Sequence, residues 1–171
     1  KIIRKIKIIS HGVTLTNNPI IKKKKLKKIN FVFYSRIHPS KNLIKLIKIW
    51  KSNYFFNKYR LDIYGEVVNF KYFLQIKKEI LNSKNIFYKG KITNNLNKKL
   101  SNYDIFLHPS KSENFGLVIL EAMSCGLFPI VNKNLDWKIL EKNKLGFSLN
   151  FTSQNLRIII IKLEKIKKYF R

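Results

Sequence analysis

The sequence predicts an α/β fold: an open, doubly wound parallel sheet with helices on both faces. Short apolar segments alternate along most of the chain with longer amphipathic ones, a pattern typical of strands that are each followed by a helix. Parallel strands joined through helices need right-handed crossovers, so the fold is Rossmann-like. The 171 residues suffice for one domain of ordinary size, with a core that needs no disulfide.

Each element follows from its own pattern. The apolar segments predict strands at 29–35, 60–65, 85–90, 103–109, 127–132 and 146–151. The amphipathic segments predict helices at 42–51, 69–82, 94–102, 115–125, 136–143 and 153–170. In the first helix, Leu43, Leu46 and Trp50 fall on one face. Pro109 stops one strand, and Gly126 is a typical stop residue for the helix before it.

A boundary in a lysine-rich segment separates residues 1–28 from a domain at 29–171. Residues 2–9 are a further candidate strand, and 13–28 are polar and end in a cluster of lysines, as in a linker or surface loop. The chain begins with Lys1 rather than Met, so we expect it to be a piece of a longer protein. Its first segment would then be the end of a preceding domain and a linker.

The chain is strongly basic, with 36 Lys and Arg against 9 Asp and Glu and a formal charge of +27. Such a charge suggests nucleic acid or another polyanion. However, the basic residues are almost all lysine, while nucleic-acid sites favour arginine. Lys, Ile and Asn all have AT-rich codons, so a genome-wide base bias explains their abundance. We therefore expect no nucleic-acid partner, but an anionic partner, including acidic lipids, remains open.

The number and spacing of cysteine and histidine residues and the length of apolar runs restrict the class of protein further. Cys125 is the one cysteine, which excludes an internal disulfide and agrees with a reducing compartment. No Cys and His spacing indicates a zinc site, so no metal is predicted. No apolar run is long enough to span a bilayer, and no charged-then-apolar segment at the start of this sequence resembles a signal peptide. A cytoplasmic location is expected, with a peripheral contact at the inner face of the membrane as an alternative.

The loop 109–115 is the first candidate site, because ligands of doubly wound sheets bind beyond the carboxyl ends of strands. The first amides of the following helix form an anion site, and Gly116 permits close approach of a ligand. Glu113 and Glu121 would lie on the order of 10 Å apart on this helix. That spacing does not suit a carboxylate pair acting on one bond, but it suits two contacts with one long ligand. The alternatives are a helix-dipole partner for Glu113 and a surface charge for Glu121.

The loop 35–41 is the second candidate site. Arg36 and Lys41 follow a strand directly and would neutralise a diphosphate, Arg as a fork and Lys as a point charge. The alternative for Lys41 is an ordinary surface lysine in a chain rich in them. Arg36 is more specific because Arg is rare in this chain.

The segment "PSKSENFGLVILEAMSCGLFPIV" resembles the signature of glycosyltransferase family 4, a family of the GT-B superfold. The matching residues are Pro109, Ser110, Glu113, Phe115, Gly116, Glu121, Ala122, Met123, Gly126 and Pro129. Upstream, "FVFYSRIHPSKNL" resembles the family's Gly-Arg…Lys-Gly segment, and "LDIYGE" and "IFYKGKI" resemble the next two strand ends. The segment "IKIISHGVTL" resembles the one that closes the family's N-terminal domain, so the resemblance spans roughly 6–150.

The resemblance implies a role for each candidate residue. Glu113 would contact hydroxyls of the donor sugar, and Glu121 would accept hydrogen bonds from the nucleotide ribose. Arg36 and Lys41 would hold the diphosphate and stabilise the leaving group in place of a metal ion. Arg36, Lys41 and Glu113 are thus the catalytic candidates. Backbone amides at the helix start would add to donor binding, at Asn114, Phe115, Gly116 and Leu117.

The sequence also departs from the family pattern. Ser35 and Asn42 stand where the family usually has Gly, and the usual Gly-Gly after the Pro-containing strand is replaced by a segment with Trp137. Trp137 fits a subset of transferases that build bacterial cell-surface polysaccharides. His108 stands where an apolar residue is usual, and we expect it and His38 to be structural.

In GT-B enzymes two Rossmann-like domains face each other, and the resemblance places 29–171 as the C-terminal, nucleotide-sugar-binding half. The acceptor-binding N-terminal half, which carries a catalytically important histidine in this family, would precede this chain. The resemblance implies retaining, metal-independent transfer from a nucleotide-diphosphate sugar, without a cofactor, to a glycan or lipid-linked acceptor. A role in polysaccharide or lipopolysaccharide synthesis is implied. The chain alone is expected to be inactive.

Two other functions remain open at this point. A polyanion- or nucleic-acid-binding module would explain the charge, and its affinity would fall steeply with salt. A non-catalytic homologue of the donor domain would explain the changes at Ser35 and Asn42. Against it stand the four residues retained in the resemblance: Arg36, Lys41, Glu113 and Glu121.

Overall fold

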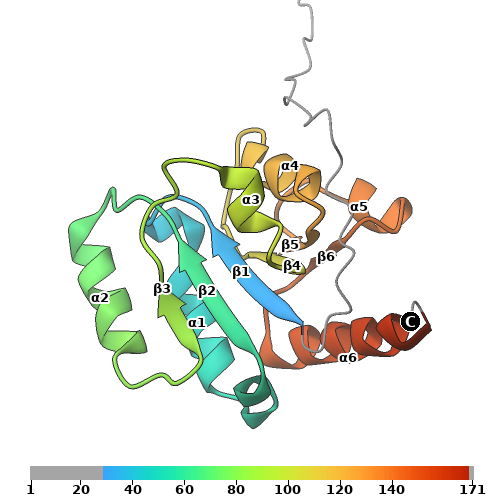
Figure 1. Cartoon of the computed structure of the whole chain (residues 1–171), viewed down its shortest axis with the longest axis horizontal. Coiled ribbons are helices and arrows are strands. Elements are labelled where there is room, and N and C mark those ends of the chain that lie inside the picture. The colour runs from blue at the N-terminus through green and yellow to red at the C-terminus, as the bar shows by residue number, and fades with distance from the viewer. Residues whose placement is uncertain (1–28, 170–171) are drawn as a thin grey trace, which may run out of the picture.

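A computed structural model describes residues 29–169 of the chain. The strand predicted at 2–9 and the linker at 13–28 lie outside the described residues. The six strands form one parallel sheet in the order β3-β2-β1-β4-β5-β6 (Figure 1). The strands are β1 (Asn30–Tyr34), β2 (Arg60–Tyr64), β3 (Ile86–Tyr88), β4 (Ile105–His108), β5 (Phe128–Asn132) and β6 (Phe147–Leu149).

The strand order reverses direction between β1 and β4, which are neighbours in the sheet. Such a reversal is typical of a doubly wound sheet, so the expected Rossmann-like α/β fold is confirmed. At such a switch point the loops after the two central strands diverge and leave a crevice between them. The two candidate loops, 35–41 and 109–115, are the ones that follow β1 and β4.

Helices cover both faces of the sheet. The helices of the described residues are α1 (Leu43–Lys51), α2 (Phe70–Ile80), α3 (Leu96–Leu100), α4 (Leu117–Ser124), α5 (Ile139–Lys142) and α6 (Ser153–Tyr169). Neighbouring residues of β1 point to opposite faces, so Phe31 and Phe33 join one apolar cluster and Val32 joins the other. The first cluster holds buried residues of α1, α2 and α6, and the second holds those of α3, α4 and α5.

Aromatic rings fill the larger cluster. Trp50 of α1 stacks on Phe56 with ring centroids 4.9 Å apart and meets the edge of Phe31 at 5.0 Å. All three side chains are fully buried. Because large aromatic side chains contribute most of the apolar area of such cores, this cluster anchors α1 and thereby the loop that precedes it.

Two short 3-10 helices were not predicted: η1 (Pro39–Lys41) and η2 (Tyr54–Lys58). In η1, Pro39 stands in the first turn, and the ring of His38 accepts a hydrogen bond from the amide of Ser40. This turn gives Lys41 a fixed place at the end of the loop after β1. Among the described residues, no helix is long and apolar enough to cross a membrane.

Candidate functional site

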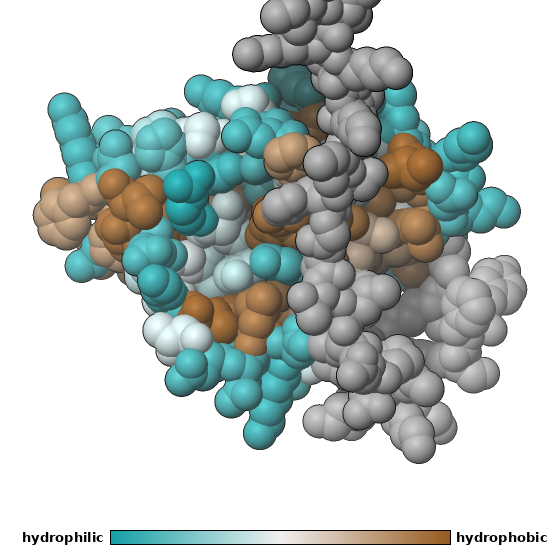
Figure 2. Space-filling view, turned by 90° about the horizontal axis from the view of Figure 1, so that it is seen from above, coloured by the Kyte–Doolittle hydropathy of each residue, from teal (hydrophilic) through white to brown (hydrophobic). Residues whose placement is uncertain are grey.

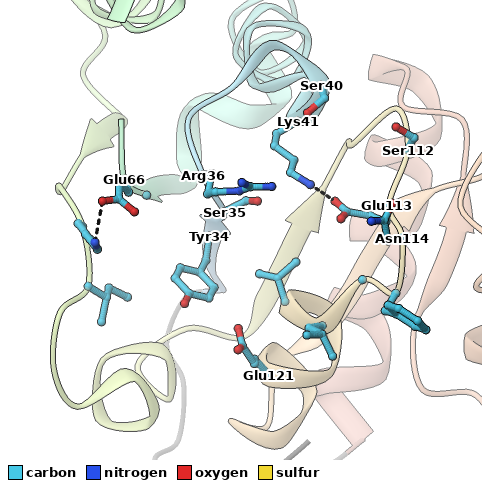
Figure 3. Close-up of a pocket in the computed structure, with 17 residues that line it drawn as sticks. Tyr34, Ser35, Arg36, Ser40, Lys41, Glu66, Ser112, Glu113, Asn114 and Glu121 are labelled. Atoms are coloured by element: carbon cyan, nitrogen blue, oxygen red, sulfur yellow. Dashed lines mark hydrogen bonds and ion pairs between the residues drawn. The ribbon is translucent and has the colours of Figure 1, made fainter. Parts of the chain in front are cut away.

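A pocket of about 620 Å³ lies at the carboxyl ends of β1 and β4, beside the start of α4 (Figure 3). It falls within the usual size range of small-molecule sites. All eight site residues predicted from the sequence line it: Arg36, Lys41, Glu113, Asn114, Phe115, Gly116, Leu117 and Glu121. The fold thus brings together the residues of both candidate loops, although their roles stay predictions. Tyr34, Gly65 and Glu66, which were not predicted as site residues, also line this pocket.

An ion pair joins the two loops across the pocket. The Nζ atom of Lys41 lies 2.6 Å from Oε1 of Glu113, and both side chains are largely buried. Directly after Lys41, Asn42 adopts a left-handed backbone with φ of 57°. Asn tolerates this conformation better than most residues, so it can stand where the resemblance would place Gly. The departure at Asn42 therefore leaves the geometry of Lys41 intact.

Glu113 has a second partner that sequence reasoning missed. The Nε2 atom of His108, at the end of β4, lies 2.6 Å from the same oxygen, Oε1. His108 is fully buried, as a structural histidine should be, but it also contacts a predicted site residue. The signal in the sequence was a polar ring at the last position of an otherwise apolar strand.

Burial and hydrogen bonding determine the charges of His108 and Glu113. Burial lowers the pKa of His108 below its usual 6.5, so the ring is neutral at pH 7. Burial on its own would raise the pKa of Glu113, but hydrogen bonds from His108 and Lys41 outweigh it and lower the pKa to about 2. The carboxylate of Glu113 is therefore ionised at every physiological pH.

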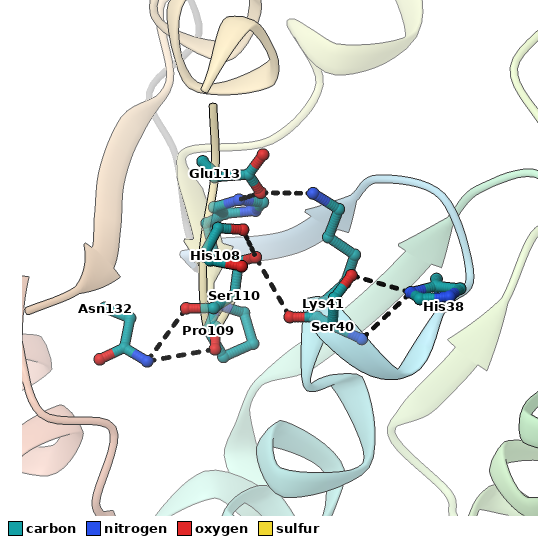
Figure 4. A network of polar contacts seen from close by, with 9 residues as sticks. His38, Ser40, Lys41, His108, Pro109, Ser110, Glu113 and Asn132 are labelled. Carbon is teal, nitrogen blue, oxygen red and sulfur yellow. Dashed lines mark hydrogen bonds and ion pairs between the residues drawn. The ribbon is translucent and has the colours of Figure 1, made fainter. Parts of the chain in front are cut away.

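Backbone contacts hold the loop after β4 against the loop after β1 (Figure 4). The carbonyl of Ser40 accepts hydrogen bonds from the amide of Lys111 at 2.9 Å and from the hydroxyl of Ser110 at 3.2 Å. The amide group of Asn132, on β5, donates to the carbonyls of Pro109 and Ser110. These bonds make the two loops one rigid wall of the pocket.

The start of α4 supplies an anion-binding element. Gly116 precedes the helix with φ of 66°, and no side chain caps the helix. A Cβ atom at Gly116 would lie 2.9 Å from Nε1 of Trp137, so Gly also permits the close approach of this ring. The first amides of a helix lack partners inside it, and they attract negative charge.

Glu121 lies one to two turns into α4 and faces the pocket from another side than Glu113 (Figure 3). Burial raises the pKa of its carboxyl group. Burial, with the charge of Glu121 as a lesser cause, also raises the pKa of Tyr34. Within the part of the chain that the structure describes, no hydrogen bond or ion pair engages this carboxylate. It is therefore available as an acceptor for a ligand.

The predicted residues of the pocket thus offer two cations, a helix start and two carboxylates at separate places. This set suits an elongated ligand with anionic groups in the middle and hydroxyl groups at both ends. The pocket is also lined by Lys91 and Glu66, which form an ion pair with each other. Over residues 29–169, no cluster of three or more His, Cys, Asp or Glu residues is placed to hold a metal ion.

The ionisable groups His108 and Glu113 should make the free energy of unfolding fall as the pH is lowered. Each group takes up a proton at a higher pH in the unfolded chain than in the folded one, so protonation favours unfolding. Stability should begin to fall below pH 6.5 through His108, and further below pH 4.5 through Glu113, whose folded pKa is about 2. The shift of Glu113 corresponds to roughly 3 kcal/mol. Thermal unfolding from pH 8 to pH 3 should show about 2 kcal/mol of this loss, because the folded pKa lies below that range. Glu113→Gln should remove this loss below pH 4.5, and an unchanged loss there would contradict the assignment.

The fold is that of the Rossmann-like C-terminal domains of GT-B glycosyltransferases, which the similar solved structures share. A family model described as "Glycosyl transferases group 1" matches residues 16–155. The chain belongs to this family.

Solved structures show the similarity of the fold. Anabaena HepE in complex with UDP-glucose has a TM-score of 0.67 and 22% identity, covering 81% of this chain and 40% of that one. A variant of S. aureus TarM, solved with UDP among its ligands, has a TM-score of 0.68 and 26% identity over 91% of this chain and 31% of that one. The C-terminal domain of the Francisella tularensis group 1 family protein LpcC has a TM-score of 0.61 and 23% identity. The match covers 81% of this chain and 76% of that one.

A curated relative is an uncharacterised 41.2 kDa protein in the cps region of Klebsiella pneumoniae. It is 29% identical over 168 residues, which cover 88% of this chain and 43% of that protein. The chain therefore spans less than half the length of this relative.

Proposed function

We propose that this chain is the C-terminal, donor-binding half of a family 4 glycosyltransferase that takes its sugar from a nucleotide-diphosphate sugar. The observation that carries this proposal is the pocket, where Arg36, Lys41 and the start of α4 lie between two carboxylates, Glu113 and Glu121. UDP and UDP-glucose are bound by the similar Anabaena HepE, and UDP by the similar TarM variant.

In this proposal each residue meets one part of the donor. Glu121 accepts hydrogen bonds from the ribose hydroxyls, and Glu113 accepts them from the sugar. Arg36 and Lys41 hold the diphosphate, together with the amides at the start of α4. These fixed donors stabilise the charge that develops on the departing phosphate, which is the task that a divalent cation performs in other transferases. Transfer is thus proposed to need no metal and, by family analogy, to retain the anomeric configuration.

The acceptor is proposed to be a glycan or a lipid-linked saccharide of the bacterial cell surface. The Klebsiella relative is in a cps region, and WaaG, whose solved structure is similar, is a glycosyltransferase involved in lipopolysaccharide biosynthesis. The acceptor and the other catalytic groups would be bound by an N-terminal Rossmann-like half. Because a transferase needs both halves, this chain alone is proposed to bind donor without turnover.

Binding tests this function directly. In calorimetric titrations the purified chain should bind UDP, and Glu121→Gln should weaken binding about 10- to 150-fold, because the ribose loses a charged acceptor worth roughly 1.5–3 kcal/mol. Glu79→Gln, on α2 and outside the pocket, is the matched control. A polyanion-binding module would instead lose affinity steeply with salt and would be indifferent to Glu121. Absence of UDP binding would overturn the proposal, and robust sugar transfer by the chain alone would overturn its second part.

A cytoplasmic location with peripheral membrane contact is proposed alongside this function. The surface of α2 supports the membrane contact. Phe70, Leu74 and Leu81 are 68%, 49% and 78% exposed and fall on one face of α2 and its C-terminal end. Exposed lysines flank this face, and the acidic residue of α2, Glu79, pairs with lysines of α1. Figure 2 shows apolar residues among hydrophilic ones at the left edge, where α2 lies in Figure 1. An apolar stripe between lysines suits an acidic lipid surface.

Vesicle sedimentation tests this contact. The chain should bind vesicles of phosphatidylcholine with phosphatidylglycerol, and Phe70→Ser with Leu74→Ser should reduce the bound fraction about tenfold, because inserted apolar area is lost. Ile139→Ser, which removes a similarly exposed apolar residue outside α2, should leave binding unchanged. Equal binding by both variants would exclude α2 as the contact surface.

A further inference from the structure

His108 is a fully buried ionisable group beside the pocket. It ends β4 in register with Val131 of β5, is 0% exposed, and stacks on Phe106 with ring centroids 5.4 Å apart. A strand position, a stacked ring and full burial leave the imidazole little freedom to turn. Its Nε2 atom points at Oε1 of Glu113, 2.6 Å away (Figure 4).

The hydrogen bonding of the ring determines where its proton lies. Nδ1 of His108 is buried and has no hydrogen-bond partner among residues 29–169. Nε2 faces a carboxylate, which only accepts hydrogen bonds. In the neutral ring the proton therefore belongs on Nε2, which donates to Glu113.

The carboxylate of Glu113 is consequently held on one side. Both of its bonds, from His108 and from Lys41, end on Oε1. Among the hydrogen bonds of residues 29–169, none ends on Oε2, which leaves that oxygen for a ligand in the pocket. The two donors differ in mobility, because the lysine side chain is long and flexible while the imidazole is locked in the core.

We propose that His108 is a positioning residue, which holds Oε1 of Glu113 so that Oε2 meets the donor sugar while Lys41 serves the diphosphate. This inference rests on the proposed function. A flexible ammonium that turns toward two phosphate groups weakens its bond to Glu113, whereas the bond from His108 does not depend on Lys41. Without His108, the carboxylate would be free to rotate when the donor arrives, and the sugar would lose a fixed acceptor.

Three replacements separate positioning from packing. In His108→Leu the new side chain fills much of the space of the imidazole but cannot donate a hydrogen bond to Glu113. In His108→Gln the side-chain amide nitrogen reaches about as far as Nε2, so it can replace the hydrogen bond. In His108→Asn the amide is too short to reach Glu113, so this variant is the polar control for the Gln variant.

The readout is the difference between UDP and a UDP-sugar in calorimetric titrations of the full chain, with UDP-glucose and UDP-N-acetylglucosamine as probes. His108→Leu and His108→Asn should weaken binding of the preferred UDP-sugar about tenfold and change UDP binding less than twofold, because UDP does not contact Glu113. His108→Gln should restore UDP-sugar affinity to within about threefold of the unchanged protein.

Other binding results would contradict either the positioning role of His108 or the proposed function. Equal loss of UDP and UDP-sugar binding in the Leu and Asn variants would show a purely structural role, and so would failure of the Gln variant to restore the sugar-dependent part. If Leu does not fold, the comparison of Asn with Gln decides in the same way. If the unchanged chain binds neither UDP nor a UDP-sugar, the proposed function fails, and the role of His108 fails with it.

Discussion

Replacement of Lys41 by Met is expected to weaken UDP binding about 10- to 150-fold, because the diphosphate loses a charged donor worth roughly 1.5–3 kcal/mol. The same change should lower the free energy of unfolding by about 3 kcal/mol, since it leaves Glu113 largely buried without its cation. Urea unfolding measures the second effect, and calorimetric titration with UDP measures the first.

Two further variants separate these effects. Lys45→Met removes an exposed lysine one helical turn away and should change neither quantity. The double variant Lys41→Met with Glu113→Gln removes both charges, so it should recover most of the stability but none of the UDP affinity. A Lys41→Met protein as stable as the unchanged chain would show that the ion pair contributes nothing to the fold.

Gly65→Ala is expected to destabilise the fold near the pocket about as much as Lys41→Met does. A Cβ atom at Gly65 would lie 1.9 Å from the backbone carbonyl oxygen of Ser35, far inside contact distance. Because backbone cannot swing aside as a side chain does, the ends of β1 and β2 must separate. We expect a loss of about 3 kcal/mol in the free energy of unfolding, at the upper end for overpacked sites.

Gly90→Ala is the matched control for this prediction. Gly90 has φ of 81°, but a Cβ atom there would meet nothing within 4 Å. Its replacement should therefore cost only the strain of a left-handed residue, about 1–2 kcal/mol. Urea unfolding of both variants makes the comparison, and equal losses would mean that the close approach of Gly65 to Ser35 is relieved by small shifts. UDP binding should suffer in Gly65→Ala alone, because Gly65 and Ser35 line the pocket.

The sequence was sufficient to predict the sheet and the pocket because both depend on local patterns. Strand and helix segments alternate regularly, and parallel strands joined by right-handed crossovers predict a doubly wound sheet. The particular order of the strands was not predicted. Loops after central strands meet at one edge, so Arg36 and Glu113 could be assigned to one site although they lie far apart in the chain.

The contacts inside the site were beyond sequence reasoning. The bond from His108 to Glu113 depends on how the loop after β4 turns back over its own strand end. The place of Lys41 depends on η1, a turn whose cap is a histidine rather than one of the usual capping residues. Short irregular turns have no periodicity, so their side-chain partners emerge only from the folded chain.

The ion pair between Lys41 and Glu113 has a consequence for selectivity. The carboxylate of Glu113 neutralises the buried cation of Lys41, so a small anion such as inorganic phosphate must compete with an internal counter-ion. Under the proposed function, a nucleotide sugar would offer compensation that phosphate lacks, since its hydroxyl groups would bind Glu113 while its diphosphate binds Lys41. The ion pair would then favour ligands that carry an anion and a polyol in one molecule.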